Sequence, residues 1–165
     1  MTTVSHPTPP AIAVFAGGAS AALLAAALFF QAIGYAPCEL CLLQRWPHAA
    51  AALIAGAVLV TGFRRAWGFL GLVAAILATG LAVYHVGVEQ TWWAGPTACS
   101  GGLGDLSTVS TDELLARIRG AQVIRCDQPS WIFLGLSMAA WNAILSAVLV
   151  AVWALSLRRS GRRKP

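Results

Sequence analysis

The chain has 165 residues, of which 58% are hydrophobic and only 10% are charged. A soluble globular domain carries about 25% charged residues, so this composition excludes an ordinary soluble protein and indicates an integral membrane protein. The net charge of +5 does not indicate nucleic-acid binding, because most of the basic residues are concentrated in two segments.

These two basic segments predict the orientation of the chain in the membrane. Arg64 and Arg65 share one short connection, and five cations occupy the tail from residue 158 onward, without an acidic residue in either segment. The positive-inside rule places both segments, and with them both termini, in the cytoplasm. The chain has four cysteines: Cys38, Cys41, Cys99 and Cys126. All of them then lie on the extracytoplasmic, or periplasmic, side, where disulfides persist.

Residues 1–10 contain no lysine or arginine and do not resemble the basic start of a signal peptide. Four apolar runs follow, and about 20 such residues cross a bilayer once as a helix. We therefore expect an all-α membrane protein, a bundle of four transmembrane helices that forms a single domain over residues 1–165. The expected spans are 11–33, 46–63, 66–88 and 131–157, and the periplasmic loops are 34–45 and 89–130. The sequence leaves open whether the second helix begins at Cys41 or at Trp46.

The long loop, residues 89–130, is mostly polar, with glycines in its first half. The segment from Ser110 to Glu113 has the pattern of a capping box and predicts a short amphipathic helix through Arg119. Its apolar face could lie on the bilayer surface or pack against the loop itself.

Cys38 and Cys41 form a Cys-x-x-Cys pair at the start of the second apolar run. The sulfurs of such a pair exchange readily when a helix N-terminus or a cation lowers the pKa of one thiol. Arg45 lies one helical turn after Cys41 and can supply that cation. Arg45 could instead anchor the helix at the interface by snorkelling. A metal site or a static cross-link is the alternative for the pair, although zinc usually takes four ligands.

Cys99 and Cys126 lie at distant positions of the long loop. Four cysteines permit three pairings, and two cysteines in each loop suggest one disulfide per loop at rest. The disulfide of the long loop could be structural. A mobile loop could also bring Cys99 to Cys38 for exchange through a mixed disulfide.

Polar residues are rare within the expected spans: among them are Gln31, Ser137, Asn142 and Ser146, with Glu89 at a boundary. An asparagine in the position of Asn142 more often ties helices together than binds a ligand. We assign no catalytic step to Glu89 or Gln90.

Three motifs together resemble the bacterial disulfide bond formation protein B (DsbB) family. They are Cys38-Glu39-Leu40-Cys41 followed by Arg45, the residues Tyr84-His85 and Gly87-Val88-Glu89-Gln90, and Cys126 leading into the run from Trp131 to Met138. The resemblance covers nearly the whole chain and includes four spans with a cysteine pair in each external loop.

The resemblance implies a multi-pass enzyme of the bacterial inner membrane, a thiol:quinone oxidoreductase. It would reoxidise DsbA, a periplasmic thioredoxin-fold dithiol oxidase, and pass the electrons to ubiquinone or menaquinone. By motif position, Cys99 would form the mixed disulfide with DsbA, and Cys126 would be its resting partner. Cys38 would receive the electrons, and Cys41 would pass them to the quinone.

The resemblance also implies that Cys41, Arg45 and His85 contact the quinone, and it implies no metal ion. A histidine that only satisfies its own hydrogen bonds at a helix end is the alternative for His85. Two other functions are compatible with the residues: a metal-handling membrane protein that uses the cysteines and His85, and a four-span scaffold held by two inert disulfides.

Overall fold

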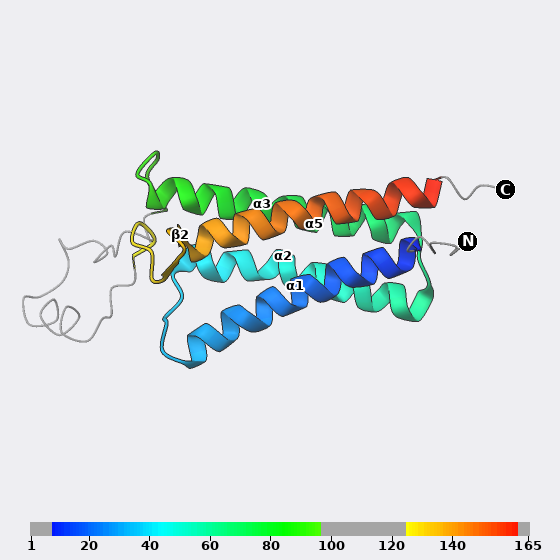
Figure 1. The fold of residues 1–165 in the computed structure, drawn as a ribbon, viewed down its shortest axis with the longest axis horizontal. Helices are drawn as coiled ribbons and strands as arrows, with labels where there is room; N and C mark the ends of the chain where they lie inside the picture. Colours follow the sequence, from blue (N-terminus) through cyan, green and yellow to red (C-terminus); the bar gives the residue numbers. More distant parts are fainter. Residues whose placement is uncertain (1–7, 97–124, 162–165) are drawn as a thin grey trace, which may run out of the picture.

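The computed structural model describes residues 8–96 and 125–161. Within these ranges the chain is built from four long helices: α1 (Pro9–Ala32), α2 (Glu39–Thr61), α3 (Arg65–Glu89) and α5 (Met138–Gly161). The helices alternate in direction along the chain and pack side by side into a bundle (Figure 1). The described residues thus confirm the expected all-helical architecture, whereas the short helix expected after Ser110 lies outside them.

The second helix begins earlier than the expected span. Cys38 is its N-cap, and the Cys38 sulfur accepts a hydrogen bond of 3.2 Å from the backbone N–H of Cys41. Residues 39–45 of the expected loop 34–45 are therefore helical, and the observed start lies near Cys41, the earlier of the two starting positions that the sequence leaves open. Pro47 lies inside α2, where its ring removes one backbone N–H without ending the helix. The helix ends at Thr61, before Gly62 with a φ of 77°.

The last helix begins later than expected. Residues 131–137, which the sequence placed in the fourth span, contain an antiparallel hairpin of β1 (Ile132–Phe133) and β2 (Leu136–Ser137). Leu134 and Gly135 both have positive φ in its turn, a conformation that a right-handed α-helix does not allow. The Ser137 hydroxyl then accepts the backbone N–H of Ala140 at 3.1 Å and caps the first turn of α5.

Small residues form the contacts between the helices. Trp153 of α5 is fully buried, and its ring packs directly on Gly71 of α3, where an added Cβ would lie 2.5 Å from the ring. Gly17 of α1 packs in the same way on Ala55 of α2. Membrane helices commonly meet through such small residues, because the backbones can then approach closely.

Three helices, α1, α3 and α5, are long and apolar enough to cross a membrane. Large apolar side chains on the outside of the bundle, such as Phe15, Leu53 and Phe69, are more than half exposed. The beginning of α1, the α2–α3 connection with Arg64 and the end of α5 lie at one end of the bundle (Figure 1). The Cys-x-x-Cys pair and the hairpin lie at the opposite end.

Candidate functional site

The site is built around the two sulfurs at the beginning of α2. Cys38 and Cys41 are both free thiols, and their Sγ atoms are 2.8 Å apart. A disulfide was expected between these two cysteines, and the structure instead has two thiols in contact. A disulfide needs about 2.05 Å between the sulfurs, so a movement of less than about 1 Å would join them.

The two thiols differ in their surroundings. Cys38 is buried, whereas Cys41 is partly exposed. The hydrogen bond that Cys38 donates to the Cys41 sulfur, together with burial, raises the pKa of the Cys38 thiol. Cys38 therefore keeps its proton at neutral pH. The hydrogen bond from Cys38 and the N-terminus of α2 both favour the thiolate form of Cys41.

Cys126 packs beside this pair. It is 1% exposed and shares a buried cluster with Cys38, Leu40 and Val88. Cys126 is disulfide-bonded, and its partner lies outside the described residues. Because Cys126 shares this cluster with Cys38, Cys126 is within reach of the first pair without a large movement.

His85 connects the two pairs. Its Nε2 atom lies 3.6 Å from the Cys38 sulfur, and its ring also hydrogen-bonds the backbone of Cys126. The carboxylate of Glu89, one turn further along α3, lies 4.0 Å from the same nitrogen. The Glu89 carboxylate accepts a hydrogen bond from the Ser137 hydroxyl, so the end of α3 is tied to the beginning of α5.

A cavity of about 330 Å³ opens beside Cys41. It lies between the second half of α1, the first turns of α2, and the hairpin with the beginning of α5, where α1 diverges from α5 (Figure 1). Its wall is mostly apolar and contains five aromatic side chains: Phe30, Tyr35, Trp131, Phe133 and Trp141. Seven further side chains with polar or reactive groups also line it: Cys41, Gln44, Arg45, His48, His85, Ser130 and Asn142.

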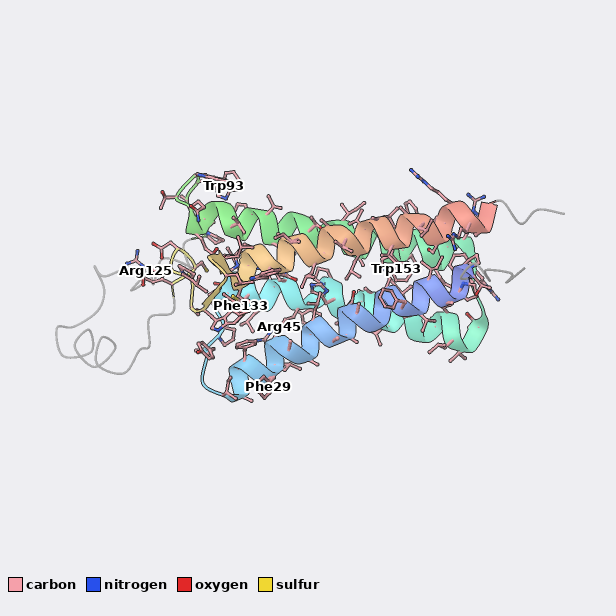
Figure 2. The ribbon with its side chains drawn as sticks, in the orientation of Figure 1. Phe29, Arg45, Trp93, Arg125, Phe133 and Trp153 are labelled. Atoms are coloured by element: carbon pink, nitrogen blue, oxygen red, sulfur yellow. The ribbon has the colours of Figure 1, made fainter. Side chains whose placement is uncertain are left out.

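Arg45 occupies this cavity wall between α1 and α2 (Figure 2). Its Nη1 atom donates a hydrogen bond of 2.7 Å to Oε1 of Gln31 on α1. Its Nε atom is buried and has no hydrogen-bond partner among the described residues. A buried donor without a partner costs free energy, so this atom is available to a polar atom of a bound ligand.

A chain of hydrogen bonds crosses the bundle behind the cavity. Gln44 Nε2 contacts both the Leu40 carbonyl, at 3.2 Å, and His85 Nδ1, at 2.8 Å. Asn142 Nδ2 donates to Gln44 Oε1 at 2.6 Å, and His48 Nε2 lies 2.9 Å from Asn142 Oδ1. The chain therefore connects α2, α3 and α5, and it reaches from the dithiol to the interior of the bundle.

The same residues offer a set of metal ligands. The ligand atoms of Cys38, Cys41 and His85 all lie within 4.8 Å of one another. Two thiolates and an imidazole suit a soft metal ion such as Zn²⁺ or Cu⁺. The metal-handling alternative thus has a geometric basis in the described residues.

The structure brings Cys38, Cys41, Arg45 and His85 together and places Cys126 next to them, and the roles of these residues stay predictions. Cys99 lies outside the described residues. Gln44 and His48 were missed, although both fall on the helix face of Cys41, three and seven residues later. Asn142 was interpreted as a tie between helices, and the structure adds that it lines the cavity.

Comparison with known proteins identifies the family. Residues 9–156 match the family model described as disulfide bond formation protein DsbB. The chain is 34% identical over 151 residues to disulfide bond formation protein B of Xanthomonas oryzae pv. oryzae (strain MAFF 311018), an alignment that covers 88% of this chain and 87% of the relative.

Two further relatives carry the same name. The protein of Azoarcus sp. (strain BH72) is 36% identical over 162 residues, or 92% of this chain and 93% of the relative. That of Xylella fastidiosa (strain Temecula1) is 34% identical over 152 residues, or 87% and 86%. No solved structure matches the chain significantly. The chain therefore belongs to the DsbB family of bacterial membrane proteins and is an oxidoreductase for disulfide formation.

Proposed function

We propose that this protein is a thiol:quinone oxidoreductase that reoxidises a DsbA-type periplasmic dithiol oxidase and delivers the electrons to membrane quinone. One observation carries the proposal. The Cys41 sulfur and the Arg45 side chain line the same apolar cavity, and the thiol of Cys38 lies 2.8 Å from the Cys41 sulfur. A dithiol, a cation and an apolar pocket are thus combined at one end of a membrane bundle.

The residues of the cavity fit a quinone ring. A volume of about 330 Å³ lies within the range of small-molecule sites. Phe30, Trp131 and Phe133 form a continuous aromatic wall, with ring centroids 5.1 and 5.5 Å apart, against which a flat ring can stack. The partnerless Nε of Arg45 can donate to a ring carbonyl. The apolar α1 residues Leu23 and Ala27 can accommodate the start of a hydrocarbon tail.

The described residues have distinct roles in this proposal. A quinone accepts two electrons and two protons, which a dithiol releases when it becomes a disulfide. Arg45 stabilises negative charge on the Cys41 sulfur and on a ring oxygen. Cys38 retains its proton until its sulfur bonds to Cys41. His85, which contacts the Cys38 sulfur, stabilises that sulfur whenever it leaves a mixed disulfide.

We further propose the order in which the cysteines act. A thiolate of the soluble partner attacks Cys99 and releases Cys126. The partner's second thiol then breaks this mixed disulfide, so the partner leaves oxidised and Cys99 and Cys126 are both thiols. The Cys99–Cys126 dithiol then reduces a Cys38–Cys41 disulfide through attack on Cys38, so Cys41 leaves as the thiolate beside Arg45. The packing of Cys126 against Cys38 supports this order, because it keeps both pairs at one place.

The orientation belongs to the same proposal. Helix α2 has 23 residues and is about 35 Å long, enough to cross the hydrocarbon core as a fourth span. Gln44, Arg45 and His48 of this helix line the cavity, and its outward residues Leu53 and Val60 are apolar. Four spans in the inner membrane would place both termini in the cytoplasm and the cysteines in the periplasm.

The direct test uses the purified full-length protein in lipid nanodiscs. A reduced DsbA-type dithiol oxidase is added with decylubiquinone or with menadione, and the absorbance of the oxidised quinone is followed. We expect the loss of one quinone for each disulfide formed in the soluble partner. Comparison of the two acceptors identifies the quinone class.

Cys41→Ser supplies the control, because it removes the thiol at the cavity and leaves the other three cysteines. We expect this variant to form a mixed disulfide with the soluble partner without reducing quinone. Quinone reduction by Cys41→Ser at the wild-type rate would overturn the proposal.

Metal handling is the second candidate, since Cys38, Cys41 and His85 lie within 4.8 Å of one another. This function predicts that protein purified without chelator carries a stoichiometric soft metal ion, measured by inductively coupled plasma mass spectrometry. It also predicts that His85→Ala loses this metal. A metal-free wild-type protein that reduces quinone would exclude this candidate.

A further inference from the structure

The inner end of the cavity contains two polar residues that the proposed mechanism does not use. His48 lies seven residues after Cys41 on α2, two helical turns or about 10 Å further into the bundle. Asn142 lies in the first turns of α5, and both side chains line the cavity. His48 is only 5% exposed. Arg45 and Cys41 are thus at the outer part of the cavity, and a second polar group is at its inner part.

The backbone determines the direction of the hydrogen bonds that reach this inner end. The Leu40 carbonyl can only accept, so the Gln44 atom 3.2 Å from it must be the amide nitrogen. Gln44 then presents its oxygen to Asn142, which must donate through its own nitrogen. Asn142 presents its oxygen to His48, so His48 must carry a hydrogen on Nε2. The protonation of His48 and the orientation of both amides follow from one backbone group.

This arrangement leaves both a donor and an acceptor for a ligand. The Asn142 amide nitrogen carries two hydrogens, and the contact with Gln44 uses one of them. A neutral His48 with its hydrogen on Nε2 has a lone pair on Nδ1. A quinone carbonyl needs a donor, and the hydroxyl of the reduced ring needs an acceptor. The pair can therefore serve both oxidation states of the same ring oxygen.

We propose that Asn142 and His48 form the binding contact for the second ring oxygen of the quinone, opposite the oxygen that Arg45 and Cys41 approach. This inference rests on the proposed function and adds the residues that orient the ring. A ring held at both oxygens has one orientation in the cavity, so its reactive face is presented to Cys41. A ring without a second oxygen in the para position would lose this contact.

The competing explanation is that His48 and Asn142 only tie α2 to α5. A variant of Ser146 distinguishes this explanation from ligand binding. The Ser146 hydroxyl lies 3.4 Å from the same Asn142 oxygen, is fully buried, and does not line the cavity. Ser146→Ala therefore disturbs the tie from the side away from the ligand. His48→Leu and Asn142→Leu remove the groups that face the cavity.

The test measures quinone binding directly. Quenching of intrinsic tryptophan fluorescence by decylubiquinone reports Kd in nanodiscs, because Trp131 and Trp141 line the cavity. We expect His48→Leu and Asn142→Leu each to raise Kd by roughly five- to tenfold, the effect of one lost hydrogen bond. Apparent KM for quinone should rise by the same factor, whereas kcat and the quinone-independent mixed disulfide with the soluble partner should change less.

Two comparisons complete the experiment. His48→Gln restores both a donor and an acceptor at a similar reach and should return Kd to within about twofold of the wild type. Ser146→Ala should leave Kd unchanged. Asn142→Leu, which keeps the number and branching of the side-chain heavy atoms, provides the answer if His48→Leu does not fold.

The outcomes distinguish failure of the proposed function from failure of this inference alone. If the wild-type protein neither binds nor reduces quinone, the proposed function itself is wrong. If the wild type does both, and the folded leucine variants bind as tightly as Ser146→Ala, then only this inference is wrong. Equal weakening in all three variants would assign His48 and Asn142 to helix packing and would also overturn it.

Discussion

At the scale of single residues, the two thiols of the Cys-x-x-Cys pair are unequal although they lie only three positions apart. Cys38 precedes the helix and donates a hydrogen bond, while Cys41 lies in the first turn and accepts it. The backbone N–H of Cys41 is directed at the Cys38 sulfur, so each residue orients the other. This asymmetry determines which sulfur reacts first with an electrophile.

We predict that iodoacetamide alkylates Cys41 at least roughly tenfold faster than Cys38 in the reduced protein at pH 7. The pKa of Cys38 is raised by its hydrogen bond to Cys41 and by burial, so Cys38 stays protonated and unreactive below that pKa. Its alkylation should increase only as the pH becomes alkaline. Peptide mass spectrometry measures both sites. In Cys41→Ala, which removes the hydrogen-bond partner, Cys38 should react faster, and equal rates in the wild type would contradict the prediction.

Arg45 combines a packed guanidinium with an unused donor, and this predicts a role in ligand binding rather than in folding. Arg45→Met keeps the length of the side chain and removes its charge. We expect Kd for quinone to rise roughly 10- to 100-fold, the effect of a lost charge-assisted hydrogen bond, with little change in thermal stability.

Gln31→Leu is the matched control for Arg45. It removes the partner of Nη1, at 2.7 Å, and leaves the guanidinium in place. Quinone affinity should fall much less in this variant than in Arg45→Met. An Arg45→Met protein that binds quinone like the wild type would show that Arg45 is only an interfacial anchor.

At the scale of helices, glycines at the contacts determine how closely α3 and α5 approach. The added methyl group of Gly71→Ala would meet the Trp153 ring, whereas the methyl group of Gly80→Ala on the same helix would meet no atom within 4 Å. We predict that Gly71→Ala lowers the free energy of unfolding by about 1–3 kcal/mol because the core is overpacked. Gly80→Ala should not be destabilising. Unfolding in mixed detergent micelles measures both, and equal stabilities would show that the helices separate without cost.

The beginning of α5 shows how one element positions another. Ser137 caps the helix through Ala140 and, at the same time, donates to the Glu89 carboxylate at the end of α3. The hairpin that ends at Ser137 carries Phe133 (Figure 2), and Phe133 and the adjacent Trp131 line the cavity. A helix through residues 131–137 would carry these rings away from that wall, so the interruption of the expected span is part of the site.

At the scale of the whole molecule, the Cys-x-x-Cys pair at the beginning of α2 lies at one end of the bundle, and the α2–α3 connection with Arg64 and the basic end of α5 lie at the other (Figure 1). This separation predicts how the protein is oriented in a cell. In a cysteine-free background, a membrane-impermeant maleimide should label Ala94→Cys in spheroplasts and Ala66→Cys only after the membrane is permeabilised. Ala66 lies in the first turn of α3 and Ala94 follows its last turn, and both are exposed. The two positions therefore differ only in the side of the membrane from which the reagent reaches them. Labelling in the reverse order would invert the topology.

Composition and residue order were sufficient for the architecture of the described residues. Long apolar runs form helices because a bilayer offers no other partner to the backbone, and these runs are visible without a structure. The Cys-x-x-Cys pair and Arg45 were also visible, since their spacing along one helix brings them together locally. The order of the cysteine relay, the quinone and the topology remain predictions.

Helix ends and the cavity depended on tertiary structure. The sequence left the start of the second helix open between Cys41 and Trp46 and included residues 131–137 in the last span. Hydrophobicity alone does not predict that a cysteine sulfur caps α2 or that Leu134 has a positive φ. His85, His48 and Asn142 come from three different helices, and no spacing along the chain relates them. Local periodicity therefore determined which residues share one helix, and only the packing of the helices decided which polar groups meet inside the bundle.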